Sequence, residues 1–287
     1  MNEQIWRLSV RSAGTSLDVL SGALYLAGYE GIEIVDSPEG AEKGRITVRA
    51  YAVARHGLEE LARVAAQVPG CEVGSLEEIE VEDWAETWKK FFQPIEVGTS
   101  LVVLPPWASA TRFPGRVPIV ISPGHAFGTG THASTRLVLE ALEDVLPRLP
   151  ARGNVADLGT GSGILAIAAL KLGLAPVIAI DIDPGAIEEA RQNARANNAH
   201  LSLRFVEGDK HDVPEATRLV MANLSAPVHR TIAPVLASRL APGGIALLAG
   251  LLADETDGVR KAWPDSWKSA VRRIDEWALV ELTRPTV

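Results

Sequence analysis

Hydrophobic and polar positions follow two different patterns along this chain. In the first eighty residues, short alternating runs are interleaved with two stretches of helical periodicity. The predicted order is strand, helix, strand, strand, helix, strand, over QIWRLSV, SLDVLSGALYLAG, GIEIVD, RITVRAYAV, GLEELARVAAQV and EVGSLEEIEVE. This order is typical of the ferredoxin-like α+β fold, so we expect residues 1–81 to form a small domain of that kind.

A short aromatic helix is predicted next. Trp84 and Trp88 recur at helical spacing, Asp83 can cap the helix, and Pro94 ends it. We expect its aromatic stripe to pack on a neighbouring domain rather than to bind a ligand. Residues 82–94 are therefore interpreted as a linker helix.

From residue 95 onward, near-continuous apolar runs alternate with amphipathic stretches. SLVVLPPW and VPIVIS are predicted as the first strands of this region. The strands that follow are NVADLG, PVIAIDI, LSLRFVEGD, TRLVMANL and GGIALLAGLL, separated by the helices GILAIAALKLG, PGAIEEARQNARANN and PVHRTIAPVLASRL and preceded by the helix STRLVLEALEDVLP. The final stretch, AVRRIDEWALVELTR, reads as an antiparallel strand pair. Residues 95–287 are thus predicted to be an α/β domain with a doubly wound, mostly parallel sheet.

Length and composition agree with two globular domains. The chain has 287 residues, of which 47% are apolar and 22% charged. Its longest apolar run, GGIALLAGLLA, is too short to cross a bilayer, and MNEQIWRLSV lacks the features of a signal peptide. Cys71 is the single cysteine, so no disulfide and no thiolate metal site is expected. These features predict a cytoplasmic protein without a membrane partner or a bound metal, and we expect a monomer.

Charge is distributed unevenly. The formal net charge is −8, and residues 1–80 contain 7 Lys/Arg against 13 Asp/Glu. An acidic chain is a poor general binder of nucleic acid, so no direct nucleic-acid contact is expected. The acidic first domain has two interpretations. It is either an ordinary solvated surface or a docking face for a basic partner protein.

A glycine-rich loop follows the predicted strand NVADL. Gly159, Gly161 and Gly163 form a G-x-G-x-G pattern, whereas dinucleotide-binding proteins show G-x-G-x-x-G, in which a helix N-terminus faces a pyrophosphate. Asp157 stands two residues before the first glycine. A carboxylate at that position would repel a pyrophosphate but suits a ligand that carries an ammonium group.

Acidic residues also end the next two predicted strands. Asp181 lies 22 residues after Gly159 and can accept hydrogen bonds from both ribose hydroxyls, and Asp209 lies where an adenine edge would be expected. Asp183 is instead interpreted as the cap of the helix that begins at Pro184. The glycine loop, the strand-end acids and the strand order together resemble a class I S-adenosylmethionine-dependent methyltransferase, which implies S-adenosylmethionine as the cofactor.

The motif NLSAP after the fourth strand of this domain indicates the methyl acceptor. The Asn223 side-chain oxygen can orient an N–H group or stabilise developing positive charge on an acceptor amine. Methyltransferases of planar amides or bases usually place an aromatic residue at the end of this motif. Here it is missing, since Asn223 is followed by Leu224, Ser225, Ala226 and Pro227. An aliphatic amine is therefore favoured as the acceptor, with Asn223 as a candidate catalytic residue.

The segment PGHAFGTGTHAST is a second glycine-rich loop and a candidate for covering the ligand. Gly128, Thr129 and Gly130 form a glycine-rich stretch ahead of a predicted helix, from which Thr135 can reach the cofactor. Phe127 can cover a sulfonium or ammonium by cation–π contact, which makes it the second candidate catalytic residue. Closure of such a loop would exclude water.

Five stretches of this sequence resemble the bacterial ribosomal protein methyltransferase family PrmA: AFGTGTH, DLGTGSGILAIAA, IDIDP, ANL and LLAGLL. The resemblance extends over nearly the whole chain and implies methylation of lysine side chains and the N-terminal amine of large-subunit ribosomal protein eleven. It also implies a substrate-recognising N-terminal domain and a loop over the cofactor at residues 127–130. The implied cofactor-binding positions are Thr135, Gly159, Asp181 and Asn223.

Two positions depart from the pattern of that family. Ser122 stands where the family usually has an acid, and His125 replaces an apolar residue. His125 is interpreted as a tolerated loop substituent rather than a base, because a desolvating pocket can itself release the lysine proton. Three alternatives stay open: a lysine methyltransferase of another protein, a nicotinamide-dependent oxidoreductase, and a non-catalytic binding module.

Overall fold

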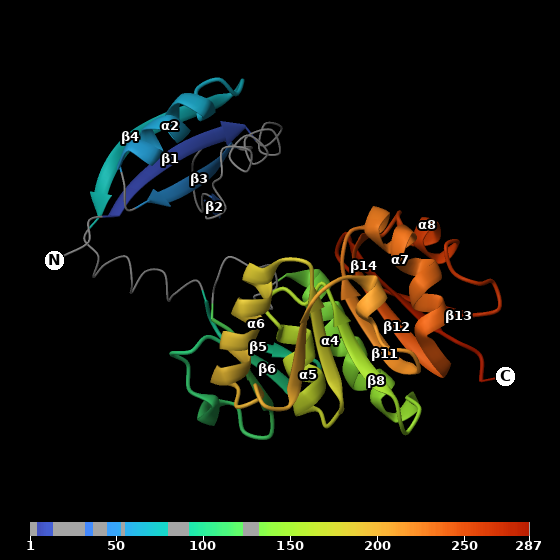
Figure 1. Ribbon diagram of the computed structural model, residues 1–287. Coiled ribbons are helices and arrows are strands. Elements are labelled where there is room, and N and C mark those ends of the chain that lie inside the picture. The colour runs from blue at the N-terminus through green and yellow to red at the C-terminus, as the bar shows by residue number, and fades with distance from the viewer. Residues whose placement is uncertain are drawn as a thin grey trace. The chain divides into compact units, whose positions relative to one another are not determined.

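The computed structural model describes residues 5–13, 32–36, 45–52, 55–79, 92–122 and 132–286 (Figure 1). The chain divides into two compact units, residues 1–92 and residues 93–287. The predicted helix at residues 16–28 lies outside the described residues, as does nearly all of the predicted linker helix. Among the described residues, no helix has the length and apolarity that crossing a bilayer requires.

The first unit is built on a four-stranded antiparallel sheet in the order β2-β3-β1-β4. Its elements are β1 (Ile5–Ala13), β2 (Ile32–Asp36), β3 (Arg45–Ala52), α2 (Arg55–Ala65) and β4 (Cys71–Ile79). One face of the sheet is covered by α2, whose Leu58 and Leu61 are buried against the alternate strand residues Leu8 and Val10. The strand order and pairing agree with the predicted ferredoxin-like arrangement.

The second unit contains a seven-stranded sheet in the order β10-β9-β8-β11-β12-β14-β13. The first five strands in that order are parallel, whereas β14 runs antiparallel to both of its neighbours. The strands are β8 (Asn154–Leu158), β9 (Val177–Asp181), β10 (Leu203–Glu207), β11 (Thr217–Asn223), β12 (Leu240–Leu252), β13 (Lys268–Ile274) and β14 (Trp277–Thr283). This order confirms the predicted class I methyltransferase fold and the antiparallel pair at its end.

Helices cover both faces of this sheet and form two hydrophobic cores (Figure 1). One face carries α4 (Ala133–Val145), α5 (Ile164–Lys171) and α6 (Pro184–Ala196), and the other carries α7 (Ala226–Arg239) and the short α8 (Thr256–Arg260). The near-continuous apolar runs of the central strands are explained by this double coverage, because both faces of each strand are buried. The sequence pattern did not indicate α8.

A separate three-stranded sheet precedes the central one. It consists of β5 (Ile95–Val97), β6 (Leu101–Leu104) and β7 (Val117–Val120), with β5 antiparallel and β7 parallel to β6. The strands β6 and β7 were predicted, whereas β5 is only three residues long and was missed. Buried residues of this sheet, among them Leu101 and Ile119, belong to the same hydrophobic core as α4.

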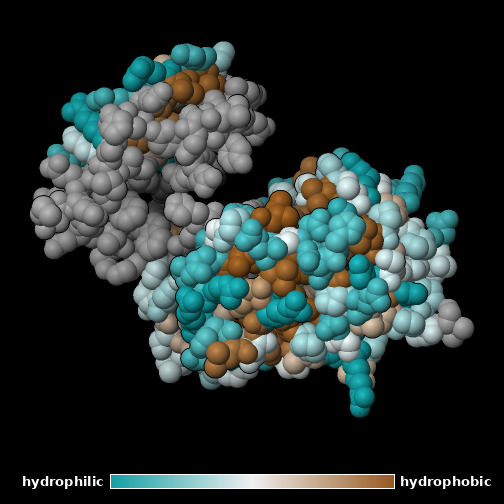
Figure 2. Space-filling view, viewed as in Figure 1, coloured by the Kyte–Doolittle hydropathy of each residue, from teal (hydrophilic) through white to brown (hydrophobic). Residues whose placement is uncertain are grey.

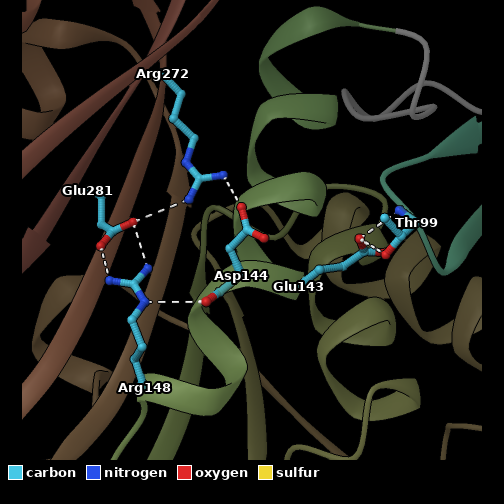
Figure 3. Close-up of polar contacts among 6 residues, drawn as sticks. All are labelled: Thr99, Glu143, Asp144, Arg148, Arg272 and Glu281. Atoms are coloured by element: carbon cyan, nitrogen blue, oxygen red, sulfur yellow. Dashed lines mark hydrogen bonds and ion pairs between the residues drawn. The ribbon is translucent and has the colours of Figure 1, made fainter.

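Polar contacts fix α4 at two places (Figure 3). The Glu143 carboxylate accepts hydrogen bonds from the backbone N–H and hydroxyl groups of Thr99 and Ser100, at 2.6–3.0 Å. Just beyond the helix, the Arg148 guanidinium donates two hydrogen bonds to the Glu281 carboxylate on β14, at 2.6 and 3.0 Å. The helix that carries Thr135 is thereby attached to the β5–β6 turn and to the antiparallel end of the sheet.

Candidate active site

A pocket of about 820 Å³ opens at the carboxyl ends of β8, β9 and β11. These three strands are neighbours in the sheet and parallel, so their ends meet at one edge, where α/β folds bind ligands. Hydrophobic residues gather between α6 and α7 on the face shown in Figure 2. Six predicted site residues line the pocket: Thr135, Gly159, Gly161, Asp181, Asp209 and Asn223.

The glycine loop passes close to its neighbours at the floor of this pocket. Gly159 has φ +72°, and a Cβ atom there would lie 2.5 Å from Cδ2 of Leu224. Gly161 also has a positive φ, of 53°. Only glycine adopts such angles without strain, so the loop leaves backbone rather than side chains facing a ligand.

Gly163 has a different function in the same loop. It is the N-cap of α5 in the left-handed conformation, and a Cβ atom there would lie 3.0 Å from Cβ of Ala190 on α6. It is not among the residues that line the pocket. The third glycine therefore permits close packing of two helices, and the structure does not support the prediction that it contacts the cofactor.

Asp181 points its carboxylate at the loop. Oδ2 accepts a hydrogen bond from the Gly161 N–H at 2.9 Å, and Oδ1 accepts one from the Asp183 N–H at 3.1 Å. No ion pair joins Asp181 to a basic side chain among the described residues. Each oxygen accepts one such hydrogen bond, so capacity remains for the hydroxyl groups of a ligand. Asp183 accepts from the Gly185 N–H at 2.8 Å, which confirms its predicted capping of α6.

Asp157 lies beneath the loop, not in the pocket. Its carboxylate is fully buried and accepts hydrogen bonds from the Thr160 hydroxyl at 2.6 Å and the Ala166 N–H at 3.0 Å. Burial raises the pKa of Asp157 to about 7, against the opposing effect of these hydrogen bonds. The predicted direct contact between Asp157 and a ligand ammonium group is therefore not supported, and its carboxylate supports the loop instead.

Asp209 lines the pocket and also caps a 3-10 helix, η4 (Lys210–Asp212). Its Oδ1 accepts from the His211 N–H at 2.8 Å, while its own N–H donates to Oδ2 of Asp212 at 2.9 Å. The hydrogen bond from the His211 backbone is the main cause that lowers the pKa of Asp209. The carboxylate is thus anionic and fixed in direction before any ligand binds.

Asn223 and Thr135 meet at the opposite wall. The Asn223 Nδ2 donates to the Thr135 hydroxyl at 3.2 Å, which links the end of β11 to the first turn of α4. The Asn223 Oδ1 is buried and has no hydrogen-bond partner. A Cβ atom on Gly250 would lie 3.0 Å from that oxygen, so glycine is required beside it. An unpartnered buried oxygen beside a pocket is typical of a site that a ligand completes.

His229 supports the same wall from behind and was not singled out from the sequence. It is fully buried on α7, and its Nε2 lies 2.8 Å from the Ala249 carbonyl oxygen. Burial lowers the pKa of His229, so its imidazole is neutral. A neutral, buried ring that bonds to β12 fixes the turn after Asn223 and does not act as a base in the pocket.

Several pocket residues were not predicted. Ile182, between Asp181 and Asp183 at the end of β9, lines the pocket and is 77% exposed although it is a large apolar residue. Leu224, Val228 and Lys210 also line the pocket. An isoleucine at that place in IDIDP was a usable signal, because exposed large apolar residues next to strand-end acids suit a flat ligand surface. Residues 123–131 lie outside the described residues, so the structure does not place Phe127, Gly128, Thr129 or Gly130.

Known proteins of one family are similar to this chain over nearly its whole length. The sequence model of the family described as ribosomal protein L11 methyltransferase (PrmA) matches residues 4–285. The chain belongs to this family. A relative named ribosomal protein L11 methyltransferase from Symbiobacterium thermophilum is 44% identical over 209 residues, covering 72% of this chain and 67% of the relative. Another from Caldicellulosiruptor saccharolyticus is 31% identical over 304 residues, covering 96% and 98%.

A solved structure agrees with the family assignment. The crystal structure of ribosomal protein L11 methylase from Lactobacillus delbrueckii subsp. bulgaricus has a TM-score of 0.61 and 29% sequence identity, and the match covers 68% of this chain and all of that chain. The family match includes both compact units. The chain is thus similar to PrmA proteins over the pocket and over the first unit alike.

Proposed function

We propose that this chain transfers methyl groups from S-adenosylmethionine to amino groups of ribosomal protein L11, on lysine side chains and at the N-terminus. The observation that carries the proposal is the pocket at the strand ends, in which the glycine loop, Asp181 and Asn223 meet within a chain of the PrmA family. The names of the relatives supply the substrate. The chemistry of the pocket independently favours the cofactor.

The residues of the pocket fit S-adenosylmethionine. The Asp181 carboxylate can accept hydrogen bonds from the ribose hydroxyl groups, and the exposed Ile182 offers an apolar surface for adenine. The charged side chains among the described lining residues are three aspartates and one lysine, Asp181, Asp183, Asp209 and Lys210. A lining with this excess of negative charge favours a cationic ligand over the pyrophosphate of a nicotinamide dinucleotide.

S-adenosylmethionine supplies an electrophilic methyl group on its sulfonium when it is bound. The chain's own residues position the acceptor. Asn223 and Thr135 form a hydrogen-bonded pair on two different elements, so neither side chain is free to rotate away. The buried Oδ1 of Asn223 is the acceptor in this pair that is left for an amine N–H. From the sequence, we assign Phe127 to cover the cationic centre.

The acceptor amine must lose a proton before transfer. A free lysine amine has a pKa of about 10.4, and removal from water lowers this value because burial disfavours the charged form. No histidine is present among the described residues that line the pocket. We infer that desolvation of the lysine, rather than a dedicated imidazole base, releases the proton.

We assign substrate recognition to residues 1–81, the linker to residues 82–94 and the transferase to residues 95–287. The described parts of residues 1–80 contain 7 of the 13 acidic residues and 6 of the 7 basic ones. Most of the excess negative charge therefore belongs to segments 1–4, 14–31, 37–44 and 80. We propose that these segments attract a basic substrate protein by their charge.

The decisive experiment is mass spectrometry of L11 after incubation with the enzyme and isotopically labelled S-adenosylmethionine. We expect mass increments on lysine residues and the N-terminal residue with wild-type enzyme, and none with Asn223→Ala. Label on another ribosomal protein with L11 untouched would replace the substrate. Binding of NADH in place of S-adenosylmethionine would overturn the reaction class.

A truncation tests the assignment of the first domain. Removal of residues 1–80 should leave S-adenosylmethionine affinity within about threefold of wild type, because the described pocket residues all belong to the second unit. Methylation of L11 should be lost. Full-rate methylation of L11 by the truncated enzyme would show that recognition is located elsewhere.

A further inference from the structure

Two buried asparagines lie one helical turn apart at the end of α6, Asn193 within the helix and Asn197 as its C-cap. Asn193 has none of its surface exposed and Asn197 only 7%. A primary amide taken out of water is costly unless its donors and acceptor are hydrogen-bonded. In both side chains the amide oxygen and the amide nitrogen are hydrogen-bonded to backbone groups, and neither side chain belongs to the pocket lining. Their partners show what each one holds.

Asn197 pairs with a single residue of β7. Its Oδ1 accepts from the Val120 N–H at 2.9 Å, and its Nδ2 donates to the Val120 carbonyl oxygen at 2.6 Å. Nδ2 also donates to the Asn193 carbonyl oxygen at 2.8 Å. Because β6 pairs with the other edge of β7, the Asn197 amide occupies the place of a neighbouring strand. Its role is to close a sheet edge.

Asn193 instead joins two different segments. Its Oδ1 accepts from the Ser122 N–H at 3.0 Å, and its Nδ2 donates to the Ser162 carbonyl oxygen at 2.9 Å. Ser162 lies between Gly161 and Gly163 in the glycine loop. Ser122 is the residue from which the chain enters 123–131, the segment that contains Phe127. One planar amide thus holds the glycine loop at Ser162 and the backbone at Ser122 at a fixed separation.

The glycine loop is consequently held from two sides. Asp181 binds the Gly161 N–H at 2.9 Å, and Asn193 binds the carbonyl oxygen of the next residue, Ser162. At the far end of 123–131, the His132 ring accepts from the Ser134 N–H as the cap of α4 and packs edge-on against Trp277 at 4.3 Å. Polar contacts therefore hold Ser122 and His132, and of the two side chains that make them, Asn193 also contacts the glycine loop.

We propose that Asn193 is a positioning residue for methyl transfer, which holds Ser162 of the glycine loop in a fixed position relative to Ser122, two residues after β7. The inference rests on the proposed function, because the position of the glycine loop matters for methyl transfer only if the pocket holds S-adenosylmethionine. Asn193 acts through the backbone of Ser162 and Ser122 and makes no contact with the ligand itself. A shift of the glycine loop by about 1 Å is enough to misplace reacting groups.

Asn193→Asp tests this with Asn197→Asp as the matched control. Asn193→Asp keeps an acceptor for the Ser122 N–H but turns the donor to Ser162 into an oxygen that faces a carbonyl. Asn197→Asp loses two donor bonds rather than one and touches no part of the glycine loop. The control should therefore lower the melting temperature of the full-length enzyme at least as much. Calorimetric S-adenosylmethionine affinity and kcat on L11 at saturating cofactor separate positioning from stability.

We expect Asn193→Asp to weaken S-adenosylmethionine affinity and lower kcat each by about tenfold, and Asn197→Asp to leave both within about threefold. Lowering the pH to about 5.5 should restore part of the affinity of Asn193→Asp relative to wild type, because a protonated carboxyl again donates to Ser162. Equal changes in the two variants, or no change in Asn193→Asp, would show that Asn193 is only structural.

The result separates the two proposals. If the wild-type enzyme does not bind S-adenosylmethionine, the proposed function is overturned and the role of Asn193 with it. If the wild-type enzyme binds S-adenosylmethionine and Asn193→Asp has the same affinity and kcat, only the role of Asn193 is overturned. If Asn193→Asp does not fold, Asn193→Ala removes the amide without adding a charge, and it is compared with Asn197→Ala by the same thresholds.

Discussion

Acidic side chains in two regions of the second unit are stabilised in different ways. At the antiparallel end of the sheet, Glu281 accepts two hydrogen bonds from Arg148, and Arg272 lies 3.6 Å away and also pairs with Asp144 (Figure 3). At the pocket, Asp181 accepts only backbone N–H groups. Arginine neutralises the first group of acids, whereas no basic side chain among the described residues forms an ion pair with Asp181.

This difference indicates which acids are available for a ligand. A carboxylate enclosed by guanidinium groups has little attraction left for a cation, because the ion pairs already satisfy its charge and lone pairs. Backbone N–H groups orient a carboxylate but carry no net charge. The Asp181 carboxylate is therefore pre-oriented and still attractive to hydroxyl groups and to a cationic ligand, as the proposed cofactor requires.

The largest effect is expected from Asp181→Ala. Loss of two hydrogen bonds from ribose hydroxyl groups to a charged acceptor should weaken S-adenosylmethionine affinity by about 100-fold, measured by calorimetry. The matched control is Asp183→Ala, two residues later. It should remove a helix cap worth about 1 kcal/mol of stability and leave affinity within about threefold. Equal losses of affinity in both variants would remove Asp181 from the ribose role.

Glu281→Ala should break the other region. Glu281 is only 7% exposed, and its loss leaves Arg148 and Arg272 without their shared partner. We expect the free energy of unfolding to fall by about 2 kcal/mol, less than for a fully buried pair because water reaches both arginines. Affinity for S-adenosylmethionine should not change.

The exposed partner of the same network supplies the control for Glu281→Ala. Asp144 is 63% exposed at its side chain, so Asp144→Asn should cost less than about 1 kcal/mol in urea unfolding. A loss of cofactor affinity in Glu281→Ala as large as that in Asp181→Ala would contradict the separation of the two regions.

Sequence patterns predicted which strands end in acids but not where each acid points. Parallel pairing brings β8 and β9 to one edge, so Asp157 and Asp181 were both expected to face the ligand. In the actual register, Asp157 lies opposite Ala179, two residues short of Asp181. That offset places Asp157 under the loop and Asp181 at its rim. Register between distant strands depends on the packing of the whole sheet, which no local pattern records.

Contacts between distant segments were equally invisible in the sequence. Asn193 and Asn197 lie in and at the end of a helix that was predicted correctly, but their partners, Ser122 after β7 and Val120 on β7, lie more than seventy positions earlier. The Glu143 contacts with Thr99 and Ser100 are of the same kind. Helix and strand periodicity determines which face is buried, whereas the identity of the opposite face comes from topology.

Asp157→Asn sharpens the comparison through pH. The folded pKa of Asp157 is raised to about 7, so the folded state binds more protons than the unfolded state between about pH 4 and 7. Stability from this group is present at low pH and is lost as pH rises through that window. The melting temperature of Asp157→Asn relative to wild type, both without cofactor, should therefore increase between about pH 5 and 8.

Glu143→Gln is the control for that experiment, because the pKa of Glu143 is shifted in the opposite direction to that of Asp157. Hydrogen bonds from Ser100 and Thr99 lower the pKa of Glu143 despite partial burial, so its stabilisation is lost only as pH falls below the ordinary glutamate range. The difference between Glu143→Gln and wild type should be constant from about pH 5 to 8. Parallel curves for Asp157→Asn and wild type over that range would show that Asp157 is ionised in the folded protein.

The smallest effect is expected from Asp209→Asn. This carboxylate is already held by the His211 N–H, and Lys210 lies 3.8 Å from its Oδ2. It is thus intermediate between the two kinds of acid, with a backbone donor and a nearby cation. An amide oxygen can still cap η4, so S-adenosylmethionine affinity should fall by about threefold or less in calorimetry. A loss as large as that for Asp181→Ala would mean that Asp209 contacts the ligand directly, and that a neighbouring lysine does not prevent an acid from binding it.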